Sequence, residues 1–216
     1  MLKADLHIHT EYSMDCNTPL EKIIARCLDI GINCITIADH GTIEGALKMQ
    51  SIAPFPVIVA EEILTSSGEI MGVFLKKGIP SGSSIEQAIS RIKAQGGLVC
   101  IPHPFDTLSR SALGGKTLEE LAEQIDFIEI FNSRSIVRQP SIGARTFADK
   151  YSIPVSAGSD AHTIGEIGKA YVEMPEFNGK DEFLNALRKG KILGRRTTPL
   201  IHLATAWAKL KRRFRG

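Results

Sequence analysis

Five of the six histidines in this 216-residue chain stand at the ends of short apolar segments that are predicted to be β-strands. Carboxylates occupy equivalent places, because Glu62 follows VIVAE and Asp160 follows VSAGS. Scattered histidines would not gather at one end of successive strands, so the pattern indicates a single site. The five are His7 and His9 in DLHIHT, His40 in TIADH, His103 in LVCIPHP and His162 in VSAGSDAH, whereas His202 lies outside the pattern and is expected to be structural.

The spacing of these residues is typical of metal ligands. In His7-Ile8-His9 the two imidazoles share one face of a strand, since side-chain direction repeats every second residue. Asp160-Ala161-His162 places a carboxylate and an imidazole in the same way. Neutral imidazole together with carboxylate suits Zn, Mn or Fe. Several cations held close together repel one another, so carboxylates are needed to offset the charge, and the candidates are Asp15, Glu62, Glu69 and Asp160.

Each motif alone is a weaker signal than the set. Asp39-His40 could be a capping pair, and Pro102-His103-Pro104 could be only a rigid turn. The joint occurrence of all these motifs at strand ends favours a metal cluster.

Apolar stretches alternate with amphipathic ones along the chain, which predicts alternating strands and helices. Repeated βα units form a parallel sheet with helices outside it. About seven strands in so short a chain favour a small closed or distorted barrel, with a doubly wound sheet as the alternative. In a barrel the carboxyl ends of the strands form the face where active sites lie. Strands are expected at Leu2–His7, Cys34–Ala38, Val57–Val59, Ile70–Leu75, Leu98–Ile101, Phe127–Ile130 and Val155–Ala157. Helices are expected at Pro19–Ile30, Ile43–Met49, Ser84–Gln95, Thr117–Glu123, Ile142–Tyr151 and Lys180–Lys189.

Length and composition are those of one globular domain, 1–216, with 43% hydrophobic and 23% charged residues. The motifs lie within about residues 1–175, and a C-terminal helical segment with a basic tail is expected from about 178 to 216. No apolar run is long enough to insert into a membrane, and the N-terminus lacks a secretory pattern, so we expect a cytoplasmic protein. The four cysteines form no CxxC pair and are expected to be reduced.

The basic charge is concentrated at the C-terminus. The last ten residues, WAKLKRRFRG, hold five basic side chains and no acidic one, which leaves 21 basic against 24 acidic residues in the rest of the chain. The tail is either a solvated helix end or a segment that makes weak contact with nucleic acid or another anionic surface.

The motifs together resemble those of the PHP family, named for polymerase and histidinol phosphatase. DLHIHTEYSMD and ITIADHGTIEGAL are similar to its first two motifs, and VIVAEEI to a strand that ends in a bridging glutamate. IPHPFD, IEIFNSR and AGSDAHTIGEIGKAY are similar to the later motifs, so the resemblance runs from Asp5 to Val172. It implies a distorted (β/α)7 barrel of the PHP type.

The resemblance also implies a centre of two to three divalent metal ions, Mn, Fe or Zn. The first position would use His7, His9, Glu62 and Asp160, the second Glu62, Glu69 and His103, and the third Asp15, His40 and His162. The alignment favours Glu62 over Glu61 as the bridging carboxylate. Gly68-Glu69 stands where many members have Gly-His, and a carboxylate there favours Mn or Fe; Glu69 could otherwise be a turn residue of a hairpin.

The implied activity is hydrolysis of a phosphate mono- or diester of a small molecule or nucleotide by a metal-activated water. The expected catalytic residues are Glu62, Asp160 and Arg134, the last as a phosphate binder, with Arg110 as a second candidate for that role. Either arginine could instead be an ordinary surface residue. The alternatives are an amide-type metallohydrolase and a non-catalytic metal-binding module. The expected partner is the phosphorylated substrate, and the sequence does not indicate an oligomeric state.

Overall fold

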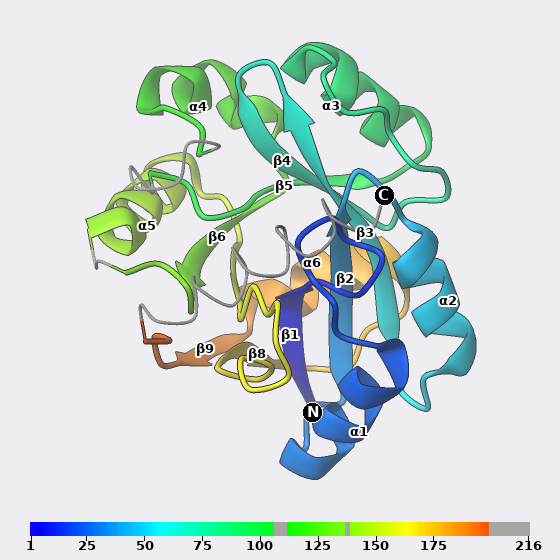
Figure 1. Cartoon of the computed structure of the whole chain (residues 1–216). Helices are drawn as coiled ribbons and strands as arrows, with labels where there is room; N and C mark the ends of the chain where they lie inside the picture. Colours follow the sequence, from blue (N-terminus) through cyan, green and yellow to red (C-terminus); the bar gives the residue numbers. More distant parts are fainter. Residues whose placement is uncertain (106–111, 137–138, 199–216) are drawn as a thin grey trace.

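The computed structural model describes residues 1–105, 112–136 and 139–198 (Figure 1). Nine strands form one sheet in the order β7-β6-β5-β4-β3-β2-β1-β8-β9. The strands are β1 (Leu2–Ile8), β2 (Cys34–His40), β3 (Val57–Thr65), β4 (Gly68–Val73), β5 (Leu98–Ile101), β6 (Phe127–Asn132), β7 (Val155–Gly158), β8 (Ala170–Met174) and β9 (Lys191–Gly194). The seven predicted strands correspond to β1–β7, whereas β8 and β9 were not predicted.

The sheet curves until β1 meets β7, and strands β1–β7 therefore form a nearly closed barrel. The closure continues just beyond β7, where Asp160 N donates to His7 O at 2.8 Å and His9 N donates to Ala161 O at 3.0 Å. Strands β8 and β9 extend the sheet from β1 as an antiparallel pair, and Ala170, Val172 and Met174 of β8 belong to the same buried apolar cluster as Ala4 of β1. The prediction of a distorted seven-stranded barrel is therefore confirmed, and the open doubly wound alternative is not.

One strand departs from the expected parallel arrangement. Strand β4 runs antiparallel to both β3 and β5, because it returns from β3 through a tight turn at Ser66 and Ser67. A turn this short leaves no room for the crossover helix that parallel neighbours need. The hairpin brings the amino end of β4 to the carboxyl ends of the other strands.

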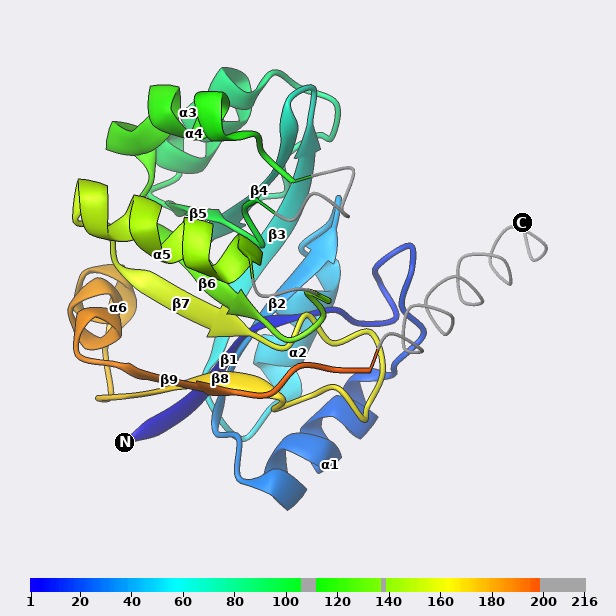
Figure 2. The same ribbon diagram turned by 90° about the vertical axis from the view of Figure 1, so that its left-hand side faces the viewer.

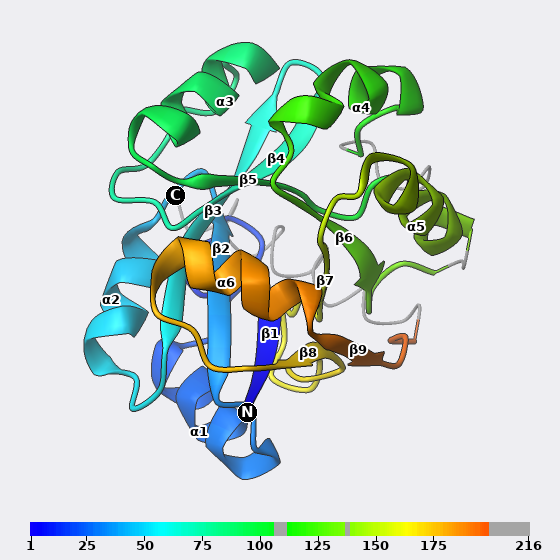
Figure 3. The same ribbon diagram turned by 180° about the vertical axis from the view of Figure 1, so that it is seen from behind.

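Helices α1–α5 surround the barrel, and α6 crosses the end opposite the β1–α1 loop (Figures 2 and 3). Their bounds are α1 (Leu20–Ile30), α2 (Glu44–Ile52), α3 (Ile85–Ala94), α4 (Gly115–Leu121, continued by a short 3-10 turn, Ala122–Gln124), α5 (Gln139–Tyr151) and α6 (Gly179–Arg188). All six correspond to predicted helices. The expected C-terminal helical segment contains strand β9 as well as α6, and the basic tail lies outside the described residues. No helix of the described ranges is long and apolar enough to cross a membrane.

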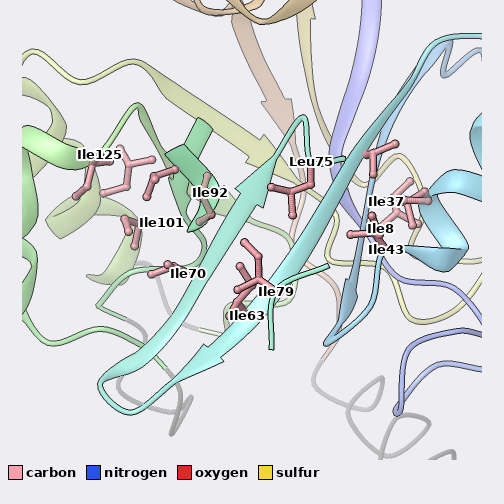
Figure 4. Packing of buried hydrophobic residues seen from close by; sticks show 14 of the residues in the cluster. Ile8, Ile37, Ile43, Ile63, Ile70, Leu75, Ile79, Ile92, Ile101 and Ile125 are labelled. Carbon is pink, nitrogen blue, oxygen red and sulfur yellow. The ribbon is translucent and has the colours of Figure 1, made fainter. Parts of the chain in front are cut away.

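Two apolar layers hold these elements together. The outer layer is rich in isoleucine, and Figure 4 shows part of it between the sheet and the helices. The inner layer fills the barrel with small side chains such as Ala4, Ala38 and Ala60, and it ends at Phe183 of α6. The Phe183 ring meets those of Phe74, Phe127 and Phe177 edge-on at 5.2–5.4 Å, so this helix closes one end of the barrel.

A bulge in β1 turns its last side chains toward the barrel axis. The register against β2 shifts between Asp5 and Ile8. Leu6 packs in the inner apolar layer but Ile8 in the outer one, although uninterrupted alternation would place both on the same face. His7 and His9, which flank Ile8, consequently face the open end of the barrel.

We predict that Gly158→Ala destabilises the protein by about 1–3 kcal/mol, as overpacking in a tight interior does. A Cβ atom on Gly158 would lie 2.3 Å from His7 Cβ and 2.9 Å from Glu129 Oε1. Gly165→Ala is the matched control, since nothing lies within 4 Å of a Cβ there, and it should change stability by less than about 0.5 kcal/mol. Urea unfolding measures both, and equal stabilities would show that β1 and β7 are not tightly packed at His7.

Candidate metal centre

The open face of the barrel brings together all nine residues that were predicted as metal ligands. They come from β1, β2, β3, β4 and the segments after β1, β5 and β7. The side chain of His40 is 18% exposed, and those of the other eight are at most 14% exposed. Three groups among the described residues have donor atoms within 4.8 Å of one another: His7, His9 and Glu62; Glu62, Glu69 and His103; and His9, Asp15, His40 and His162.

The first group lies where β1 meets β7. His7 Nε2 and His9 Nε2 are 3.2 Å apart, and each is 3.4 Å from Glu62 Oε2. Asp160 Oδ1 completes the group at 3.2 Å from His9 Nε2 and 3.9 Å from His7 Nε2. Three of the four residues that the family resemblance assigns to one metal position therefore form one donor group, and Asp160 lies beside its two histidines.

The second group shares Glu62 with the first. Glu62 Oε1 lies 2.8 Å from His103 Nε2, and Glu69 Oε2 lies 3.9 Å from the same nitrogen. Glu69 belongs to strand β4, not to the turn before it, and only 8% of the residue is exposed. Glu61 points away from this group, because its Oε2 accepts a hydrogen bond from Ile79 N at 2.8 Å.

The third group forms around Asp15. Its Oδ2 lies 3.2 Å from His162 Nε2 and 3.5 Å from His40 Nε2. The loop that carries Asp15 is tied to the β7–β8 segment, because Thr18 Oγ1 donates to His162 O at 3.1 Å. Asp39, beside His40 in the sequence, lies outside the cluster and accepts from Thr10 N and Thr10 Oγ1.

The spacing of these donor atoms fits divalent ions. Bonds of about 2.1 Å in a tetrahedral set place donor atoms about 3.4 Å apart, close to the separations in the first and third groups. The second polar atom of a predicted ligand is often held by another contact. Ser13 Oγ donates to Asp15 Oδ1 at 2.9 Å, and His162 Nδ1 lies 2.9 Å from Asp160 O. Such contacts orient metal ligands and fix imidazole tautomers.

The electrostatics of the cluster keep its carboxylates ionised. Burial would raise the pKa of Glu62, but the charges of His7 and His40 hold it well below its ordinary value. Burial opposes charge on His103, yet Glu62 raises the pKa of His103 to about 10. Burial and the charge of His162 lower the pKa of His9 to about 3, so that imidazole is neutral. Anionic carboxylates are available as ligands, and ions that bind here must displace protons from some of the imidazoles.

Glu129 contacts two of the predicted ligands, and sequence reasoning missed it. It lies in β6 and is 3% exposed; its Oε1 is 3.2 Å from His7 Nδ1, and its Oε2 accepts from His103 N at 2.8 Å. Asn132 Nδ2 donates to Glu129 Oε2 at 2.9 Å and lies 3.2 Å from Asp160 Oδ2. A glutamate inside the apolar strand FIEIF was the available signal, since a buried carboxylate requires polar partners.

Two ligand-bearing positions have left-handed backbones, which are uncommon for residues other than glycine. The φ angle is 30° at His103 and 52° at Asp160. Each is held by a hydrogen bond from its own N–H, to Glu129 Oε2 and to His7 O respectively. Strained backbones of this kind persist where the surrounding structure fixes them, typically at functional sites.

Arg134, the predicted phosphate binder, is buried beside the cluster. Its NH1 group donates to Glu166 Oε1 at 3.0 Å, and Glu166 Oε2 accepts from His162 N at 3.1 Å. Burial would raise the pKa of Asp160, but His7, His9, His162 and also the charge of Arg134 lower it below its ordinary range. The other candidate, Arg110, lies outside the described residues.

Comparison with known proteins agrees with this geometry. A family model described as the PHP domain matches residues 5–57, and a second, described as PHP-associated, matches residues 143–192. Uncharacterized protein MJ0417 of Methanocaldococcus jannaschii is 34% identical over 197 residues, which cover 87% of this chain and 79% of that protein. The chain belongs to the PHP family. The first matched segment carries four of the predicted ligands, and the second carries Asp160 and His162.

Solved structures resemble this barrel at low sequence identity. A two-domain protein from Bacteroides vulgatus containing a predicted PHP-like metal-dependent phosphoesterase superposes with a TM-score of 0.72 and 16% identity. The match covers 90% of this PHP chain and 65% of that protein, so our chain spans less than two thirds of its length. An amidohydrolase from Chromobacterium violaceum, solved with bound sulfate and no metal, has a TM-score of 0.65 and 17% identity over 88% of this chain and 97% of its own.

We predict that Glu62→Gln lowers the bound metal by at least one ion per chain, because a carboxylate near two groups both binds ions and reduces their mutual repulsion. Glu61→Gln is the matched control, since its side chain bonds to Ile79 N and not to the cluster. Elemental analysis of both folded variants after reconstitution with Mn or Zn measures the difference. If Glu61→Gln is the variant that loses metal, the bridging role belongs to Glu61.

Glu129→Gln should weaken metal affinity about 10–100-fold, the usual effect of removing a group that orients a ligand. A glutamine has a single side-chain oxygen, so it cannot accept from both His7 Nδ1 and His103 N. Glu123→Gln, an exposed substitution in the same region, should leave affinity unchanged. Competition with a chromophoric chelator gives both affinities, and equal values would show that Glu129 only fills space.

Proposed function

We propose that this PHP protein is a metal-dependent hydrolase that acts on phosphate mono- or diesters of a small molecule or nucleotide. The main support for the proposal is that three groups of donor atoms lie together, two of them sharing Glu62 and the third containing the neighbouring Asp15. When bound, two to three divalent ions would polarise the ester and lower the pKa of a water. A cluster of several ions suits an anionic phosphate better than a neutral amide, since the ions offset the charge of the substrate.

In this proposal the protein supplies the ligands of the ions and an arginine for the substrate. Glu62 would hold the ions of the first two groups and Asp160 that of the first, with His9 as a neutral donor and His7 as a donor once an ion displaces its proton. The carboxylates remain ionised because histidines surround them, so they bind ions without having to lose a proton first. None of these ligands is assigned as a free general base, since a nitrogen or oxygen bound to an ion is a poor proton acceptor.

Arg134 is proposed to stabilise negative charge on the substrate. Its guanidinium stays next to Asp160 because Glu166, which is fully buried, fixes its position. An arginine held in this way loses little further side-chain entropy on binding, and a planar guanidinium can contact two phosphate oxygens.

Amide hydrolysis is the second candidate, and the resemblance to an amidohydrolase favours it. A non-catalytic metal-binding module is the third. The geometry argues against the third, because metal storage does not require a buried arginine beside the cluster. A cytoplasmic location remains a prediction, which the four buried, reduced cysteines support.

A substrate panel tests the proposal most simply. Protein reconstituted with Mn, Fe or Zn should hydrolyse at least one phosphate ester among p-nitrophenyl phosphate, bis-p-nitrophenyl phosphate and a set of nucleotides and sugar phosphates. Removal of the ions with a chelator should lower the rate at least 100-fold, and re-addition should restore it, because the ions supply electrostatic stabilisation that the side chains alone cannot.

Hydrolysis of N-acyl amides without any phosphatase activity would contradict the phosphoesterase proposal and favour the second candidate. Bound metal with no hydrolysis of either class would favour the third. Arg134→Lys keeps the charge but not the planar group, so a tenfold or larger loss in kcat/KM with unchanged metal content would support phosphate contact by Arg134.

A further inference from the structure

A second cavity lies outside the metal centre, between the start of α5, the end of β6 and strand β9. Its volume is about 830 Å³, within the range of about 300–1,000 Å³ that holds small molecules. Phe131, Ile142 and Ile192 provide apolar surface, and none of the proposed metal ligands lines the cavity.

The polar lining of this cavity is strongly basic. Arg145 of α5 and Arg195 and Arg196 beyond β9 line it, and the lining includes no aspartate or glutamate. Within the described ranges, Arg145 and Arg195 form no salt bridge with a carboxylate. Arg145 and Arg195 therefore line one cavity that has no carboxylate in its lining, and their charges repel each other, so an anionic ligand would relieve an unfavourable charge arrangement.

Arg196 is already held in place for such a ligand. Its NH1 group donates to Ser135 O, its NH2 group donates to Ser141 Oγ at 3.2 Å, and its guanidinium lies 5.6 Å from the centre of the Phe131 ring. A guanidinium that is fixed before binding loses little entropy when it contacts an anion. Arginine also matches the geometry of phosphate oxygens better than lysine does.

The cavity is connected to the metal centre through the segment after β6. Thr197 N and Thr197 Oγ1 both donate to Ser133 O, at 2.7 and 3.0 Å, and Ser133 Oγ donates to Ser159 O at 2.7 Å. Ser133 and Ser159 immediately precede Arg134 and Asp160 in the sequence. A ligand in the cavity would therefore be connected through these hydrogen bonds to the segments that carry Arg134 and Asp160.

We propose that this cavity is a second ligand site that binds a phosphate-bearing small molecule, such as a nucleotide. The phosphate would contact Arg145, Arg195 and Arg196, and the apolar part of the ligand would lie on Phe131, Ile142 and Ile192. The site is independent of the reaction at the metal centre, so it can exist even if the substrate there is not a phosphate ester.

The test is a titration of the Zn-loaded, full-length protein followed by ¹H–¹⁵N NMR, which gives both location and affinity. The main probe is the 5′-methylenephosphonate analogue of AMP, whose P–C bond cannot be hydrolysed; adenosine and inorganic phosphate are the comparison ligands. We expect shifts at the amides of Ser141, Thr146 and Gly194. The double variant Arg145→Ala/Arg195→Ala should raise the Kd at least tenfold, whereas Arg91→Ala, an exposed arginine of α3, should leave it within twofold.

Three results would overturn the proposal. They are shifts confined to amides of the metal face, adenosine that binds as tightly as its phosphonate analogue, and a Kd of the double variant within twofold of the parent value. Thermal unfolding of the double variant checks that it is folded, and both substituted arginines are exposed, so the substitutions leave the core intact. Weaker binding of inorganic phosphate at the same amides would support the arginines as the phosphate contact.

Discussion

The arrangement of the whole site depends on how one buried carboxylate, Glu62, is compensated. Its Oε2 lies 3.4–3.5 Å from nitrogens of His7, His9 and His40, and its Oε1 lies 2.8 Å from His103. A carboxylate that is 1% exposed is tolerated only where partners replace the water it has lost. Those partners come from β1, from the end of β2 and from the segment after β5. Compensation of the Glu62 charge therefore requires these three parts of the barrel to lie close together.

The two ends of the barrel are filled differently, and the site lies at the end that apolar side chains do not fill. Small inner side chains and Phe183 of α6 fill one end, and polar groups fill the other. The bulge in β1 and the antiparallel strand β4 are the irregularities that aim His7, His9 and Glu69 at the open end. Glu129 links these parts, because it contacts His7 from one oxygen and fixes the left-handed backbone of His103 with the other.

Sequence reasoning predicted the parts of the fold that depend on periodicity. The seven barrel strands are continuous apolar runs between turn residues, and HxH and DxH place their ligands on a common face whatever the wider fold. Strands β8 and β9 were missed, because AYVEM and KILG are not continuous apolar runs like the predicted strands, and they pair antiparallel beyond β1 and not as βα units. The direction of β4 was also missed, since it depends on the length of the turn at Ser66 and Ser67 and not on the composition of the strand.

Within the site, residue type and spacing selected residues that the structure brings together, but not the groups that contact them from behind. Glu129, Asn132 and Glu166 act through contacts with residues distant in sequence, and such pairings are set by the three-dimensional packing. Glu69 was predicted as a ligand from the family motif; the structure places it in β4 with its carboxylate 3.8 Å from His40 Nδ1.

The central claim is that Glu62 bridges ions in a centre that contains at least two of them. A crystal structure of Mn- or Zn-loaded protein, with anomalous difference maps recorded at the absorption edge of the metal, tests this directly. The account predicts two or three peaks, two of them on opposite oxygens of Glu62 and, where a third is present, one beside Asp15. A single peak that does not contact Glu62, or no peak at any occupancy after loading, would contradict it.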